Sequence, residues 1–191
     1  MGTLALGFSV LVFSQGATAK NPGKPSAEGS ESCGISSGTL KLTPQSGSPG
    51  TMGVALTAVY PPNPCAGTAH LSGGGSVTIS GLALKGQGTA TASPTGDICD
   101  LGTITVTLSW KSGPKVAPTM LSYQGGTWSP PGPPNLPASG GSLMSDTGSF
   151  SGGAATFSPK SVWPPNPCAG TKPITVHITG GTLAIGPPSA T

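Results

Sequence analysis

The chain has 191 residues, a formal net charge of +3 and only 7% charged residues, against about 25% in an ordinary globular protein. Its eight basic residues are all lysines scattered along the chain, which excludes the clustered arginines typical of nucleic-acid binding. The 32 glycines and 22 prolines exclude long helices, because each costs roughly 1–3 kcal/mol in a helix interior. The low charge also argues against simple disorder, which usually needs a high net charge.

Residues 1–19 have the features of a secretory signal peptide. An apolar run over 4–13 is followed by A-T-A at 17–19, the pattern of a signal peptidase site. No basic residue precedes the apolar run, so a buried apolar segment is the alternative, and the run is too short to span a bilayer. We therefore predict export to the cell envelope or the medium, no membrane span in the mature chain, and a flexible polar leader over 20–32.

Short segments of alternating polar and apolar residues follow, separated by Gly and Pro. In the clearest one Ile104, Val106 and Leu108 share one face. At Gly81 the alternation slips by one residue, which a β-bulge would reconcile, and Gly180-Gly181 predicts a turn. We predict an all-β fold, an internally duplicated sandwich or barrel of about nine short antiparallel strands. The segments are 39–43, 52–60, 76–85, 89–92, 103–110, 119–123, 149–157, 174–178 and 182–185.

One eight-residue sequence, P-P-N-P-C-A-G-T, occurs twice in the chain. It follows Tyr60 in the first copy and Trp163 in the second. The repeat predicts an internal duplication, and we interpret the segment itself as a structural corner between strands.

The duplication predicts one β-domain in which two copies close a single core. Two halves this small would bury too little surface to fold alone with ease. The second half is longer because it carries an insertion of 37 residues. The predicted boundaries are domain 33–186, halves 33–98 and 99–186, insertion around 114–148 and tail 187–191.

Four cysteines in an exported chain predict two disulfides. Three pairings are open. The duplication favours Cys33–Cys65 with Cys99–Cys168, because each half then carries its own equivalent bond. No two cysteines lie within four residues and the histidines are not at ligand spacing, so neither a metal site nor a cofactor is expected.

Candidate catalytic groups are few. Residues 34–38 match G-x-S-x-G, but a nucleophile elbow needs a following helix, and a chain rich in Gly and Ser matches this pattern by chance. Outside the leader three carboxylates remain, two of them beside Cys99 in the manner of turn residues. We predict a protein that is not an enzyme and keep a secreted hydrolase as the alternative. The acids and histidines concerned are Asp97, Asp100, Asp146, His70 and His177.

Three aromatic residues beside Pro-Pro segments are candidates for contact with a partner: Tyr60, Trp128 and Trp163. Exposed rings next to stiff polyproline can stack on sugars or bind a partner strand. The alternative, which we favour, is that Tyr60 and Trp163 pack on their own prolines and cap the core. Trp110 ends an alternating apolar face and is predicted to lie in the core.

The sequence from Cys99 onward resembles a family of secreted, uncharacterised proteins of actinobacteria that are rich in Gly, Ser and Thr. The shared features are the strand after Cys99, W-K at Trp110, P-T at Pro118, G-S-F-x-G at 148–152, and the closing I-T-V…G-G-T-L-A-I-G. The resemblance implies an exported, disulfide-bonded β protein without established activity. It supplies no catalytic residue.

These features favour an exported, non-enzymatic β-domain that acts as a binding or structural module of the cell envelope or the extracellular space. The alternative is a barrel that holds a small apolar or glycan ligand inside. That alternative predicts a cavity lined by the inward faces of 103–110 and 174–178.

Overall fold

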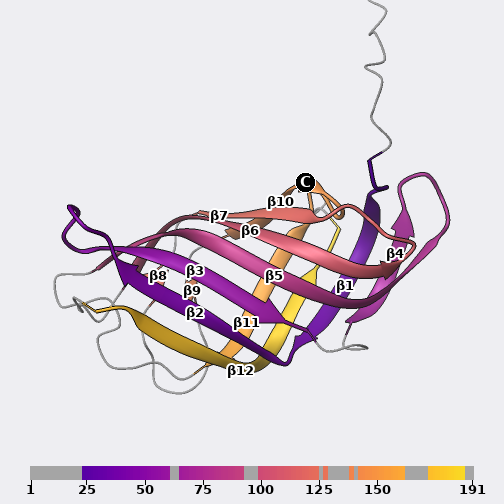
Figure 1. Ribbon diagram of the computed structural model, residues 1–191. Helices are drawn as coiled ribbons and strands as arrows, with labels where there is room; N and C mark the ends of the chain where they lie inside the picture. Colours follow the sequence, from indigo (N-terminus) through magenta and orange to yellow (C-terminus); the bar gives the residue numbers. More distant parts are fainter. Residues whose placement is uncertain are drawn as a thin grey trace, which may run out of the picture.

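The computed structural model describes residues 23–60, 65–92, 99–124, 127–128, 138–139, 142–161 and 172–187. Within them the fold is all-β, as predicted (Figure 1). The strands are β1 (Ala27–Ile35), β2 (Ser37–Pro44), β3 (Thr51–Val59), β4 (Cys65–Leu71), β5 (Ser76–Ala92), β6 (Cys99–Gly113), β7 (Thr119–Gln124), β8 (Thr127–Trp128), β9 (Ala138–Ser139), β10 (Ser142–Gly148), β11 (Ala154–Ser161) and β12 (Ile174–Ile185).

The strands form a closed barrel rather than an open sandwich. The pairings β1–β4–β5–β3–β2–β12 return to β1, which closes a six-stranded barrel. From β12 the sheet also continues through β11, β10, β7 and β6 back to β5, so the remaining side is closed as well. All pairings are antiparallel, and closure removes the free edges that an open sheet would expose.

Two long strands carry the chain from one side of the barrel to the other. β12 pairs with β2 along its first half and with β1 along its second half, in one unbroken register. In Figure 1, β7, β6, β5, β3, β2 and the first half of β12 lie side by side in the foreground, with β11 and the second half of β12 behind them. On the other side β5 pairs first with β4 and then with β3.

The glycine pair in β12 bends the strand instead of ending it. We predicted a turn at Gly180-Gly181 between two strands, and this prediction is wrong. Gly181 pairs with Ile35 on one side and Pro159 on the other. Its φ of 128° lies in a region that a side chain disfavours, so glycine allows the bend where β12 passes from β2 to β1. The predicted bulge beside Gly81 is confirmed by a register shift between Ile79 and Gly81.

The predicted leader is wrong over residues 27–32. These residues belong to β1, which pairs with β4 on one edge and β12 on the other. Its inward positions include Gly29 and Glu31, so no hydrophobic alternation marks it in the sequence. Backbone hydrogen bonds on both edges recruit this polar segment into the sheet.

The C-A-G-T part of the first repeat is a strand, not a corner. Cys65 begins β4 and lies opposite Cys33 in the β1–β4 ladder, where the two form the predicted disulfide. A Cβ atom on Gly67 would collide with the carbonyl oxygen of Ser30, so this close pairing requires glycine. Residues 61–64 and most of the second repeat lie outside the described residues.

The barrel interior is one hydrophobic cluster that draws on both halves of the chain. Its side chains alternate with outward residues along β2, β3 and much of β12, as expected for the wall of a small barrel. The largest side chains with almost no exposed surface are Leu40, Leu42, Met52, Leu108, Leu121, Leu183 and Ile185.

A hydrogen-bond network holds the start of β1 against the turns at one end of the barrel. The Ser149 hydroxyl accepts from the Ala27 amide at 3.0 Å and donates to the Ala117 carbonyl at 2.7 Å. The Thr119 hydroxyl donates to the Ser149 carbonyl at 2.6 Å and accepts from the Trp110 indole at 2.8 Å. The network therefore ties the chain around Ala27 to the turns that follow β6 and β10.

Glu31 is a buried carboxyl and should make stability depend on pH. The residue is 5% exposed, and within the described residues its carboxyl group makes no hydrogen bond or ion pair. Burial raises the pKa of Glu31 above its usual 4.5, so the folded state holds the proton more tightly than the unfolded chain does. The free energy of unfolding should therefore fall as pH rises from about the unfolded value through the raised pKa.

We expect Glu31→Gln to remove this fall, so that the variant is more stable than the parent at pH 7 and the gap closes toward pH 4. Urea unfolding at several pH values measures it. Glu28→Gln, on the same strand but exposed, is the matched control and should change little. A parent and a Glu31→Gln variant with parallel pH profiles would contradict the expectation.

Candidate functional site

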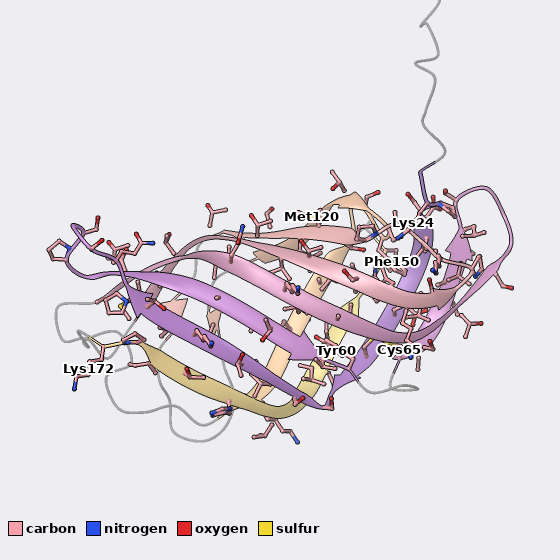
Figure 2. All side chains as sticks on the ribbon, in the orientation of Figure 1. Lys24, Tyr60, Cys65, Met120, Phe150 and Lys172 are labelled. Atoms are coloured by element: carbon pink, nitrogen blue, oxygen red, sulfur yellow. A yellow bond between two sulfur atoms is a disulfide. The ribbon has the colours of Figure 1, made fainter. Side chains whose placement is uncertain are left out.

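The structure places Tyr60 in the core and not at a partner surface. Its side chain is 4% exposed, and its amide donates to the Leu82 carbonyl at 3.2 Å. Among the described residues its buried hydroxyl has no hydrogen-bond partner, and burial raises the pKa of Tyr60 above its usual range. Figure 2 shows Tyr60 beside the end of β3. Tyr60 therefore belongs to the core, while the prolines on which we expected it to pack lie outside the described residues.

The side chains of the other two aromatic candidates lie outside the described part of the structure. Trp128 pairs through its backbone with Cys99 in β6–β8, and Trp163 lies outside the described residues. Trp110 packs against the core cluster, and its ring meets that of Phe150 edge to face at 5.0 Å.

The predicted acids and histidines are dispersed. Asp97 lies outside the described residues, while Asp100 and Asp146 are placed by backbone only, in β6 and β10. His70 lies on β4, and His177 faces outward from β12. The described residues hold no cluster of three His, Cys, Asp or Glu side chains that would suit a metal ion.

A hollow of about 340 Å³ lies at the end of the barrel where β1 begins. His70 and Glu28 are partners across β1–β4, with Nε2 and Oε2 3.6 Å apart, and both side chains are more than half exposed. Ser151 and Phe150 also line this hollow. A serine, a histidine and a carboxylate therefore line the same hollow. No hydrogen bond among the described residues joins Ser151 to His70, as a nucleophile and its base would require.

The inward faces that would line an internal ligand cavity are packed together instead. Ile104, Val106 and Leu108 of β6 and Val176 and Ile178 of β12 all belong to the core cluster. None of the three hollows described here is lined mainly by these side chains.

The outer surface over β12, β2, β3, β5 and β6 carries aligned polar residues, which we call the threonine face. Register places them in two rows that cross five strands. One row is Thr175, Lys41, Ala55, Gln87 and Thr105. The other row is His177, Thr39, Thr57, Lys85 and Thr107.

Hydroxyl groups dominate this face. The Thr39 and Thr57 hydroxyls lie 2.8 Å apart and share a hydrogen bond across β2 and β3. A hydroxyl both donates and accepts, so the face offers either kind of partner to a ligand. The residues occupy the outward positions of alternating strands, which are exposed or half-buried in the structure.

Two shallow hollows lie on the threonine face. The first, of about 530 Å³, lies over β12, β2 and β3 and is lined by Thr39, Thr57 and His177 among others. The second, of about 590 Å³, lies over β3, β5 and β6 and includes Gln87 and Thr105 in its lining. The second hollow contains Gly53, an outward position of β3 where the absence of a side chain lowers the surface.

Sequence reasoning missed this face as a site. The alternation of T-L-K-L-T at 39–43 and of I-T-V-H-I at 174–178 directs Lys41 and His177 outward, and T-I-T-V-T at 103–107 has the same pattern. What joins them into one surface is the order of the strands, since β3 pairs with β5 and β2 with β12.

No family model, curated protein or solved structure matches this chain. The resemblance to secreted actinobacterial proteins therefore stays a prediction. Within the described residues no helix has the length and apolar character needed to cross a membrane.

Proposed function

We propose that this protein is an exported, non-enzymatic β-barrel module that binds an extended carbohydrate chain on its threonine face, in the cell envelope or outside the cell. The observation that carries the proposal is the pair of hollows on one hydroxyl-lined face, outside a packed interior. A polysaccharide matches such a surface, because sugar hydroxyls also donate and accept. The signal-like residues 1–19 support export.

Binding to soluble polysaccharides tests the proposal. Native affinity electrophoresis of the mature protein in gels with xylan, dextran, hydroxyethyl cellulose or an acidic polysaccharide should show retardation by at least one of them. Ala55 lies outward on β3 and lines the second hollow, and Ala55→Glu should weaken binding about tenfold or more, near 1.4 kcal/mol.

Ala184→Glu is the matched control for that variant. Ala184 is an exposed, outward residue of β12 on the far half of the strand, where it pairs with Thr156 and Ser32. It should bind like the parent. The proposal would be contradicted if no polysaccharide retarded the protein, or if Ala55→Glu and Ala184→Glu weakened binding equally.

The proposal that the protein is not an enzyme is tested separately, at the hollow where β1 begins. Hydrolysis of a p-nitrophenyl ester that is lost in both His70→Ala and Ser151→Ala would contradict it, because these residues line the hollow together with Glu28.

We infer a second disulfide between Cys99 and Cys168. The even cysteine count and the duplication support it. Register also places Ile174 and Ile104 on one row across β2, β3 and β5, so β12 and β6 begin at the same end of the barrel. The six residues from Cys168 to Ile174 reach up to about 20 Å. Peptide mapping without reductant should find this pair beside Cys33–Cys65, and a free thiol at either position would refute it.

A further inference from the structure

The two hollows of the threonine face lie on a diagonal across β3. The first hollow contacts β3 at Thr57 and Val59 and otherwise lies toward β2 and β12. The second contacts β3 from Gly53 to Ala55 and otherwise lies mainly toward β5 and β6. A chain that occupies both hollows therefore crosses β3 between Thr57 and Ala55.

Two lysines stand on either side of that crossing. Lys41 on β2 is the register partner of Ala55, and Lys85 on β5 is the register partner of Thr57. Both point outward and are exposed. Two strand spacings and one step of two residues separate them, which puts their Cα atoms roughly 12 Å apart.

Among the described residues neither ammonium group has a counter-ion, because no described lysine takes part in an ion pair. The described carboxylates whose side chains are placed, Glu28 and Glu31, lie on β1 and not on the threonine face. An anionic group laid across β3 would therefore meet two positive charges, with no carboxylate among the described side chains of the face to repel it.

We propose that the ligand of the threonine face is an anionic polysaccharide whose acidic groups pair with Lys41 and Lys85 where the chain crosses β3. This inference rests on the proposed carbohydrate-binding function and narrows its ligand class. The hydroxyls of Thr39, Thr57 and Thr105 meet the sugar hydroxyls, and the two ammonium groups select chains that carry charge. The shared chemistry is a repeated carboxylate or phosphate on a polyhydroxylated chain.

Isothermal titration of the mature protein with three probes tests the inference. The probes are polygalacturonate, its neutral methyl ester, and a glycerol-phosphate teichoic acid. At least one anionic probe should bind more tightly than the methyl ester, and its affinity should fall as salt rises from 20 to 500 mM because exposed charges are screened, with a Debye length of about 10 Å at 0.1 M. The anionic probe that binds more tightly shows whether the face prefers carboxylate or phosphate groups.

The double variant K41Q/K85Q should bind that probe about three- to thirty-fold more weakly, because it removes two exposed ion pairs with the ligand. The matched control is K24Q/K115Q. It removes the same charge from two exposed lysines that lie away from the threonine face, near the end of the barrel where β1 begins. It should bind as the parent does.

The outcomes separate the two proposals. If the methyl ester binds as tightly as the anionic probes, or if K41Q/K85Q binds like its control, the anionic ligand is refuted while carbohydrate binding stands. If no polysaccharide binds at all, both fail. Equal affinity for double-stranded DNA would also overturn the inference, because it would show that charge alone is recognised.

Discussion

Replacing both Cys33 and Cys65 by alanine is expected to lower the free energy of unfolding by about 3–4 kcal/mol. The bond closes a loop with a sequence separation of 32 residues, so it restricts the unfolded chain substantially. It also joins β1 to β4, the pairing by which the first strand enters the barrel. Since a domain of this size is stable by only about 5–15 kcal/mol, the loss is a large share.

Urea unfolding followed by tryptophan fluorescence measures this effect. The double variant separates the Cys33–Cys65 bond from any second one, since reductant breaks every disulfide while the substitution removes only this pair. The variant should therefore still lose stability on reduction if Cys99 and Cys168 are joined. A double variant within 1 kcal/mol of the parent would show that the bond does not hold β1 in place.

Thr119→Val is expected to lower the free energy of unfolding by about 2–4 kcal/mol, because it leaves two buried polar groups without partners. The Ser149 carbonyl loses a donor at 2.6 Å, and the Trp110 indole loses its acceptor at 2.8 Å. Thr119 is fully buried, so water does not replace these bonds easily. Valine keeps the shape of threonine, which confines the change to the hydroxyl.

Thr182→Val provides the control, because Thr182 is an exposed strand residue of β12 for which the same exchange should cost almost nothing. Hydrogen exchange adds a local readout. The Ala27 and Phe150 amides, which donate to Ser149 and Ala27, should lose protection in Thr119→Val and keep it in Thr182→Val. Unchanged protection would mean that the start of β1 is held by other contacts.

The strands with strong alternation could be predicted from sequence, and those without it could not. β3 and β6 lie where their apolar periodicity indicated, because one face of each must be buried. β1 and β4 were missed, because their inward positions hold Gly29, Glu31 and Gly67 or small residues. Their place in the barrel comes from backbone pairing and the Cys33–Cys65 bond, which leave no periodic signal.

The candidate site shows the same division. Alternation was enough to direct Lys41 and His177 outward. It was not enough to bring Lys41 within reach of Lys85, because these residues lie on β2 and β5, and only β3 between them sets their separation. Tyr60 was a candidate for contact with a partner because it precedes two prolines, but in the closed barrel its side chain is buried.

The sequence by itself determined the β class, which follows from residue composition and period-two alternation, and its repeat favoured the Cys33–Cys65 pairing that the structure contains. Only the tertiary structure decided that the sheet closes into a barrel and that β12 bends at Gly181 to serve two neighbours. Strand order depends on long-range pairing, which local residue patterns do not encode. That order alone assembles the threonine face and sets Lys41 and Lys85 on either side of one crossing point.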